Sequence, residues 1–455
     1  MNSVIQHKKT ILPFFALVLL ACFELLSAAQ AVVPTPDGAY PGGNTAEGQN
    51  ALLSLTTGGY NTGVGYLTLR SNTTGGLNTA VGAGTLLANT ADQNTATGAG
   101  ALFSNTSGFG NTADGALALF NNTTGAQNTA NGITALFINT SGDNNTAIGI
   151  SALFTNATGS SNTASGYKAL ISNTTGNQNT AMGVSALFSN ITADHNTAIG
   201  AFALDNNTIG DSNTALGDSA LQSNTTGIGN TGTGSSALGG NTTGDTNTAI
   251  GLGALEANTS GSDNVALGRA TGFNATTGNN NVYIGAGILG VAGESNACYI
   301  ASIFGQTSPN GIPVFINSDN KLGTATSSKR FKQDIKPINE ASEALFSLKP
   351  VTFRYKKEID PAGRSQFGLV AEEVEKVNPD LVVRDKNGDI YAVRYEQVNA
   401  MLLNEFLKEH KTVQAQGATI TELKTQIQAL TAGLQKVSAQ LKLNKPAPQT
   451  VLNDQ

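Results

Sequence analysis

The chain has 455 residues, no tryptophan and only 12% charged residues, and its formal net charge is −6. Tight nucleic-acid binding needs positive charge concentrated on one surface, so this composition excludes nucleic acid as a partner. The low charge does not indicate disorder, because apolar residues recur at fixed places.

The first 31 residues have the features of a signal peptide. Lys8 and Lys9 precede an apolar run from Ile11 to Leu26, and small residues allow cleavage after Ala31. Cys22, in Leu-Leu-Ala-Cys, leaves a lipoprotein signal as an alternative. We therefore expect a secreted or surface-exposed protein with no membrane span once the signal is removed.

The longest feature is a repeat of seventeen residues, with one spacing of sixteen, that reads N-T-A-x-G-x-x-A-L-x-x-N-T-T-G-x-x. A period this short fits one turn of a solenoid and no helix pair. The first residues of the units are Asn44, Asn61, Asn78, Asn94, Asn111, Asn128, Asn145, Asn162, Asn179, Asn196, Asn213, Asn230, Asn247, Asn264 and Asn281.

The composition of each unit favours β structure over helix. Glycine, asparagine and threonine are poor residues for a helix interior, and N-T-T-G is a turn sequence in which glycine supplies positive φ. We therefore expect short strands around N-T-A-x-G and around x-A-L-x. The missing residue lies between Ala91 and Asp92, in the expected turn, where a deletion is tolerated.

The repeat offers a single chain little apolar area to bury. One Leu and two Ala per turn, with Phe beside the Leu in some units, barely offset the backbone entropy of seventeen ordered residues. Three chains packed side by side would share the Leu and Phe rows, so we expect a homotrimer. The repeat resembles the left-handed β-roll heads of trimeric autotransporter adhesins, which implies the same architecture. The phenylalanines are Phe103, Phe120, Phe137, Phe154 and Phe188.

Nearly identical turns pose a problem of register. Sliding one chain by a whole unit changes few contacts, so misaligned trimers are close in energy. Only the C-terminal third is non-repetitive, and it is therefore expected to set the register.

The C-terminal third alternates short strands and helices. The patterns predict a hairpin at 312–316 and 321–326, a helix from Asn339 to Leu348, a strand at 351–355, a helix at 368–377 and a turn between strands at 385–389.

Two motifs in this part resemble the C-terminal intramolecular chaperone domain of phage endosialidases and tail spikes, a self-cleaving peptidase family. The family opens with Ser-Asp-x-Arg-x-Lys, and Ser327, Arg330 and Lys332 match it, whereas Ser328 replaces the Asp. The second motif is G-L-V-A-E-E-V-E at 368–375. The resemblance covers 327–411 and implies a chaperone for three chains.

The last helix carries the heptad seam of a coiled coil. By the usual rule its Ile and Leu favour two strands, whereas the family resemblance implies three. Glu409 and Gln416 interrupt one row. The seam consists of Leu402, Phe406, Val413, Ile420, Leu423, Ile427, Leu430, Leu434, Val437 and Leu441.

Ser327 and Lys332 are the candidate catalytic residues. After removal of the signal peptide the histidines are His195, in the repeat, and His410, on the last helix, which argues against a Ser-His-Asp site; a Ser-Lys pair needs no histidine. Ser327 is the nucleophile toward the carbonyl of Thr326, Lys332 is the general base, and Arg330 supports a lowered pKa of Lys332. The resemblance implies cleavage of the Thr326-Ser327 bond after trimerisation.

Several alternatives remain open. Ser327 instead caps a helix whose Lys329, Arg330 and Lys332 form a solvated face. In that case the chain is a structural surface protein that does not cleave itself. A phage-derived tail fibre or spike is a separate alternative, against which the signal peptide argues, because phage fibres assemble in the cytoplasm. An outward Thr ladder is also typical of an ice-binding solenoid. No metal or cofactor is proposed, and the cell-surface or carbohydrate ligand of the fibre is unknown.

The expected fold is therefore mainly β, with a β-roll or β-solenoid rod, a small α+β chaperone domain and a C-terminal coiled-coil helix. The expected order is a signal peptide (1–31), a linker (32–43), the repeat (44–300), a hairpin neck (301–326), the chaperone domain (327–411), the coiled coil (412–443) and a flexible tail (444–455).

Overall fold

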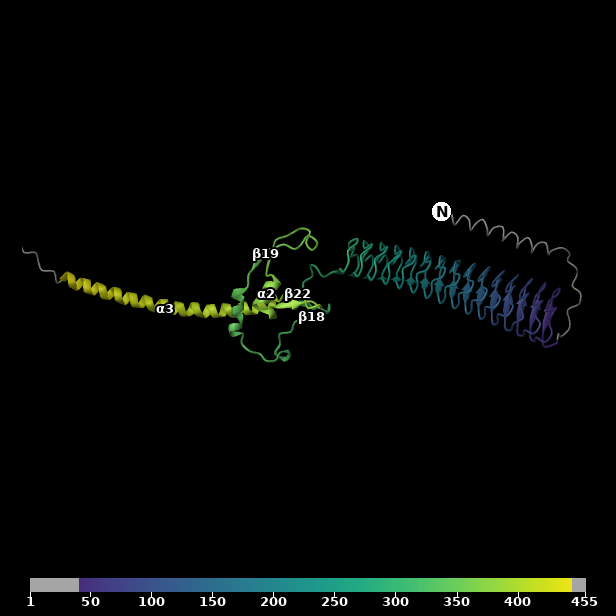
Figure 1. Cartoon of the computed structure of the whole chain (residues 1–455), viewed down its shortest axis with the longest axis horizontal. Coiled ribbons are helices and arrows are strands. Elements are labelled where there is room, and N and C mark those ends of the chain that lie inside the picture. Colours follow the sequence, from purple (N-terminus) through teal and green to yellow (C-terminus); the bar gives the residue numbers. More distant parts are fainter. Residues whose placement is uncertain (1–40, 444–455) are drawn as a thin grey trace, which may run out of the picture. The chain divides into compact units, whose positions relative to one another are not determined.

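A computed structural model describes residues 41–443. The predicted signal peptide, most of the predicted linker and the predicted C-terminal tail therefore lie outside the described residues. The chain divides into two compact units at Gln306/Thr307, which Figure 1 shows in colours that follow the sequence. The first is a parallel β-solenoid, and the second contains small antiparallel sheets and a long helix, as the sequence predicted.

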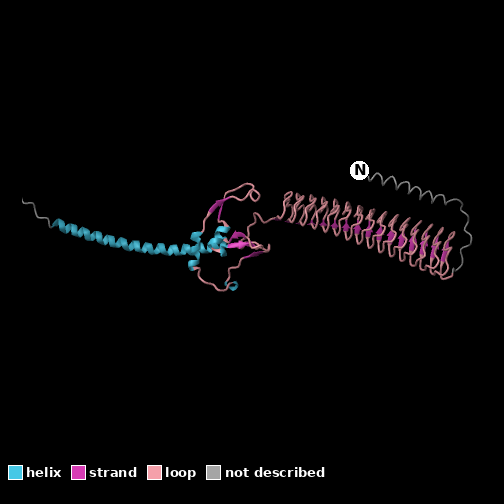
Figure 2. Cartoon of the chain, viewed as in Figure 1, coloured by secondary structure: helices cyan, strands magenta, loops and turns pink. Residues whose placement is uncertain are grey.

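The solenoid has one three-residue strand per turn, and each strand pairs in parallel with the strands of the neighbouring turns (Figure 2). Pairing is in register, with Thr45 opposite Thr62 and Thr62 opposite Thr79. The strands are β1 (Thr45–Glu47), β2 (Thr62–Val64), β3 (Thr79–Val81), β4 (Thr95–Thr97), β5 (Thr112–Asp114), β6 (Thr129–Asn131), β7 (Thr146–Ile148), β8 (Thr163–Ser165), β9 (Thr180–Met182), β10 (Thr197–Ile199), β11 (Thr214–Leu216), β12 (Thr231–Thr233), β13 (Thr248–Ile250), β14 (Val265–Leu267), β15 (Val282–Ile284) and β16 (Cys298–Ile300).

The predicted second strand at x-A-L-x is wrong. This segment forms turns, and the Leu of every unit from Leu52 to Leu255 has a left-handed backbone, with φ between 49° and 54°. That conformation costs about 1–2 kcal/mol for a residue other than glycine. Complete burial of a leucine side chain returns about 1.5–3 kcal/mol, so the apolar contact outweighs the backbone strain.

The role predicted for the glycine of N-T-T-G is also wrong. The glycine with positive φ is the one that follows the strand, where φ lies between 112° and 147°. The N-T-T-G glycine is needed for close packing instead: a Cβ on Gly125 would lie 2.5 Å from the Gly142 carbonyl oxygen and 2.5 Å from Asn122 Oδ1. Successive turns therefore approach too closely for most side chains, although alanine takes this place in two units, at Ala91 and Ala193.

A ladder of buried asparagines runs through the whole solenoid. The Asn that opens each unit is at most 5% exposed. Asn179, for example, donates its backbone N–H to Asn162 Oδ1 (3.0 Å), and its amide nitrogen donates to Asn162 Oδ1 (3.2 Å) and to the Ala193 carbonyl (2.8 Å). Its own Oδ1 accepts from the Asn196 backbone (3.0 Å). Each turn thus satisfies polar groups of the turn before it.

A second ladder joins the asparagines of N-T-T-G, and the deletion interrupts it. Asn105 donates to Asn89 Oδ1 (2.7 Å), and the pattern continues to Asn258. In the short unit, the Asn89 amide donates to the Ala91 carbonyl, and Asn72 Oδ1 is left buried without a partner. The missing residue is therefore tolerated at the cost of one rung.

The apolar core closes within a single chain. The leucines from Leu69 to Leu255 are fully buried between the strand alanines and the turns. The expectation that neighbouring chains share the Leu row is therefore wrong. The Phe row is partly covered, and Phe103, Phe120, Phe137 and Phe154 stack with centroid separations of 4.9–5.4 Å.

The core changes composition at its C-terminal end. Tyr283 takes the inward place that alanine holds in the earlier strands, and it is fully buried and stacked on Tyr299. Gly272 replaces the leucine nearby, where a Cβ would lie 3.0 Å from the Tyr283 ring. One large ring thus fills the space of a leucine and an alanine.

The second unit begins with the predicted hairpin, in which β17 (Val314–Ile316) pairs antiparallel with β18 (Leu322–Thr324). A second hairpin joins β19 (Val351–Phe353) to β20 (Gln366–Gly368), and a third joins β21 (Val382–Arg384) to β22 (Ile390–Val393). The turn at 385–389 is confirmed. The helices are η1 (Lys329–Phe331), η2 (Asn339–Ser347), α2 (Ala371–Val377), η3 (Pro379–Leu381) and α3 (Tyr395–Leu443), of which the η elements are 3-10 helices.

Two helix predictions need correction. The helix expected from Asn339 is a 3-10 helix, and its N-terminal flanking residue is Ile338 without a side-chain cap. The helix expected over 368–377 begins only at Ala371, because Gly368 still pairs with Val351 in the hairpin.

Within residues 41–443, no helix is long and apolar enough to cross a membrane. The longest, α3, instead has its seam residues 50–75% exposed in the single chain.

We expect the asparagine ladder to be essential for stability. Asn179→Ala removes two donors and one acceptor and leaves the buried Asn196 backbone N–H unpaired, whereas the Ala193 carbonyl keeps its bond from Asn190. An unpaired buried group costs about 1–3 kcal/mol, and the lost hydrogen bonds add to this cost. The variant should lose about 2 kcal/mol or more of unfolding free energy, measured by urea denaturation. Asn206→Ala, at an exposed position, should change it by less than about 0.5 kcal/mol. Equal values for the two variants would contradict the role of the ladder.

Candidate functional site

The segment from Ser327 to Lys336 follows β18 and is exposed along its whole length. Residues 329–331 form the single turn η1, in which the Phe331 backbone donates to the Ser328 carbonyl (3.0 Å). The Arg330 guanidinium lies over the Phe331 ring, 4.6 Å from its centroid. The chain around the predicted nucleophile is thus ordered by local contacts.

In the structure, Ser327 and Lys332 do not form a catalytic pair. No hydrogen bond joins the two side chains, and both are exposed. Lys332 has an extended backbone at the end of η1, with φ −123° and ψ 143°. A Ser-Lys pair needs the lysine neutral, which requires burial. A single chain therefore does not assemble the predicted site.

The alternative in which Ser327 caps a helix is wrong about the residue. The residue that flanks η1 is Ser328, which has φ −64° and ψ 139° and makes no side-chain cap hydrogen bond. Lys329, Arg330 and Lys332 are exposed, as that interpretation expects.

The second motif lies in the folded core of this unit. Gly368 ends β20, and α2 places Val374 against Leu381, Val382 and Met401. The Leu369 backbone donates to the Tyr395 hydroxyl (3.0 Å), which links the start of the motif to the start of α3. The motif thus connects the β19–β20 hairpin to the long helix.

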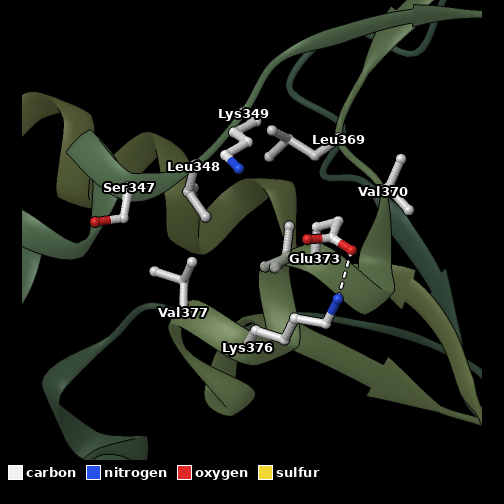
Figure 3. Close-up of a pocket in the computed structure, with 9 residues that line it drawn as sticks. Ser347, Leu348, Lys349, Leu369, Val370, Glu373, Lys376 and Val377 are labelled. Carbon is white, nitrogen blue, oxygen red and sulfur yellow. Dashed lines mark hydrogen bonds and ion pairs between the residues drawn. The ribbon is translucent and has the colours of Figure 1, made fainter.

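A pocket of about 210 Å³ lies beside α2 (Figure 3). Lys376 donates to Glu373 (2.6 Å) at its edge, and this hydrogen bond and the ammonium charge lower the pKa of the Glu373 carboxyl. The lining contains no residue of the Ser327–Lys332 segment. The lining residues are Ser347, Leu348, Lys349, Leu369, Val370, Glu373, Val374, Lys376 and Val377.

A polar cluster fixes η2 on the first turns of α3, and sequence reasoning missed it. Ser342 is fully buried, donates to the Glu405 carboxylate and accepts from the Asn404 amide (2.7 Å). Lys408 pairs with Glu405 (2.8 Å) and with Glu343 (3.5 Å). The polar residues at 404, 405 and 408, on a helix face away from the seam, were the only signal in the sequence.

This cluster leaves the seam of α3 free. At 100° per residue, Met401, Asn404, Glu405 and Lys408 lie about a third of a turn around the helix from Leu402 and Phe406. Leu402 and Phe406 are 60% and 65% exposed. The small domain therefore attaches to one face of the helix while another face is available to other chains.

Residues 327–383 match the family model described as the chaperone of endosialidase. The match begins at Ser327, includes both sequence motifs and ends within β21. No curated protein and no solved structure matches the chain. The resemblance drawn from the two motifs is confirmed for this part, called the chaperone segment below. The chain thus has a β-solenoid followed by a chaperone-of-endosialidase segment.

The Glu405 carboxylate gives the second unit a dependence on pH. Hydrogen bonds, first from Lys408 and then from Ser342, lower the pKa of this carboxyl below its usual value. Its contribution to the stability of the fold is therefore present above the unfolded pKa of about 4.3 and is lost as pH falls through the folded pKa. Glu405→Gln should lower the helix melting temperature near neutral pH, and this difference should shrink in acid. Melting followed by far-ultraviolet circular dichroism measures it.

Glu343→Gln is the matched control, because Glu343 contacts the same Lys408 from a 60% exposed position. It should leave the melting temperature nearly unchanged at every pH. A constant difference between wild type and Glu405→Gln from neutral pH to acid would contradict the assigned role.

Proposed function

We propose that the protein is a fibre of three identical chains, in which the chaperone segment aligns the chains and then cuts the Thr326-Ser327 bond. The observation that carries the proposal is the position of the family match, which begins at Ser327 directly after a solenoid and a hairpin neck. The peptide bond to be cut thus lies at the start of the chaperone segment.

The unpartnered seam of α3 supports assembly. A helix with heptad-spaced apolar residues on one face packs against copies of itself, and no other described element covers this face. We choose a three-stranded coiled coil because a solenoid followed by a chaperone segment is the order of a tail fibre, and the family resemblance implies three chains.

Cleavage in this proposal waits for assembly. In one chain Lys332 is exposed, so neighbouring chains must bury it before it can act as a base. Ser327 Oγ then attacks the Thr326 carbonyl carbon while Lys332 takes its proton. The C–N bond breaks, Lys332 protonates the Ser327 amine, and water hydrolyses the ester, leaving a carboxylate on Thr326.

A phage-type tail fibre is the second candidate, because the order of solenoid and chaperone segment fits it equally well. The leader-like sequence at Lys8, Lys9 and the following apolar run favours export to the outside or the surface of a cell instead. Sequencing the mature N-terminus distinguishes the two, since export predicts a start after Ala31.

Wild-type protein should yield two fragments on a denaturing gel, with Ser327 as the new N-terminus of the smaller one. Ser327→Ala and Lys332→Ala should each leave one band, because the nucleophile or the base is missing. Ser328→Ala and Lys329→Ala are matched neighbours that should still be cut. A single wild-type band would refute self-cleavage and leave the aligning role to be judged by the mass of the assembly.

Light scattering should give three chain masses for the full protein. Ile427→Asp places a charge in the seam and should lower the assembly mass, because a carboxylate cannot be buried unpaired among apolar side chains. Gln428→Asp adds the same charge to the next residue, outside the seam, and should keep the trimer. Loss of the trimer in both variants, or in neither, would contradict the assignment of the seam.

A further inference from the structure

The outer face of the solenoid sheet carries a column of exposed apolar side chains. In each strand the middle residue points inward and the third residue points outward. Ten of these third residues are large and apolar, and they are 37–47% exposed. We call this set the outer column: Val64, Val81, Ile148, Met182, Ile199, Leu216, Ile250, Leu267, Ile284 and Ile300.

In-register pairing aligns the residues of the outer column into runs along the sheet. Met182, Ile199 and Leu216 lie on adjacent strands, as do Leu267, Ile284 and Ile300. Adjacent strands are about 4.8 Å apart, so neighbouring side chains of the column touch. Single exposed apolar residues need no explanation, but runs of such residues on adjacent strands indicate a contact surface.

Few charged residues stand in this row. Glu47 and Asp114 are the charged residues among the third positions of strands β1 to β16. The other third positions are apolar or neutral, so most of the row can be covered without burying a charge.

We propose that the outer column packs against the outer column of a second copy of this chain, parallel and in register. The proposal rests on the assembly described under Proposed function. It differs from the expectation that the Leu row is shared, because the leucines are already buried within one chain.

The order of apolar and polar residues in the row identifies the occupant. Thr97, Asp114 and Asn131 take the third position on three successive strands, and Ser165 and Thr233 interrupt the row further along. A uniformly apolar partner, such as a lipid surface, would desolvate these polar groups without pairing them. A copy in register places apolar residues opposite apolar ones and places Thr97 and Asn131 opposite side chains that can hydrogen-bond. At β1 and β5 it places like charges opposite each other, which opposes the contact at those two strands.

The same order makes the solenoid able to set its own register. In register, all ten apolar residues of the row face apolar residues. A shift by one turn leaves six such pairs and places Asn131 opposite Ile148 and Thr97 opposite Val81. Aligned and shifted assemblies therefore differ more in contact energy than the consensus repeat indicates. The solenoid can then help the chaperone segment to fix the alignment of the chains.

Labelling of single cysteines tests whether the column is covered. In a Cys298→Ser background, Met182→Cys lies in the column and Ile228→Cys lies outside it, at sites 46% and 48% exposed in one chain. Native full-length protein should react with a maleimide at least tenfold more slowly at 182 than at 228, and both should react rapidly in denaturant. Equal native rates, with light scattering still giving three chains, would overturn the proposal and leave the proposed function intact. A single-chain mass would instead refute the proposed function.

Mixed assemblies test the register. Chains with Met182→Cys and chains with Ile199→Cys, both in the Cys298→Ser background, are expressed together and joined by a short dibromobimane cross-link. In-register packing predicts mainly 182–182 and 199–199 products by peptide mass spectrometry. A predominance of 182–199 products would show a shift of one turn and would overturn the proposed register.

Discussion

The solenoid depends on the buried asparagine that opens each turn, whose amide bonds to its own turn and to the turns on both sides. Water is excluded, so the N–H groups, the carbonyls and the side-chain amides must pair with each other. The result is a polar ladder inside an apolar core, in which every rung fixes the position of the next. Leucines accept a strained left-handed backbone because the same turns enclose their side chains.

This constraint decides which surfaces are left for assembly. A chain whose leucines and asparagines are satisfied internally has no reason to share its core with a neighbour. Two long rows of apolar side chains stay exposed in the single chain: the outer column of the sheet and the seam of α3. In the proposed assembly, a second copy of the chain covers each of them.

The repeat could be recognised from the sequence because the same residue types return at a fixed spacing. The short strand could be predicted from the Thr-Ala-x segment before a glycine. The left-handed leucines could not be predicted, since leucine seldom adopts this conformation and only the closed turn makes it favourable. The chaperone segment was recognised from Ser327, Arg330, Lys332 and the 368–375 motif. The hydrogen bond between Ser342 and Glu405 joins residues that are 63 positions apart in the sequence, and no local sequence pattern predicts such a contact.

The two proposals together explain why a fibre can lose its chaperone. If the bond after Thr326 is cut, any alignment held only by the chaperone segment and α3 is lost when that fragment dissociates. A rod whose outer column matches best in register would keep its alignment through its own contacts. The chaperone segment then determines how chains first meet, and the solenoid determines how long they stay aligned. In such a fibre, persistence after cleavage would depend on how slowly the solenoids separate, because the segment that first aligned them is gone.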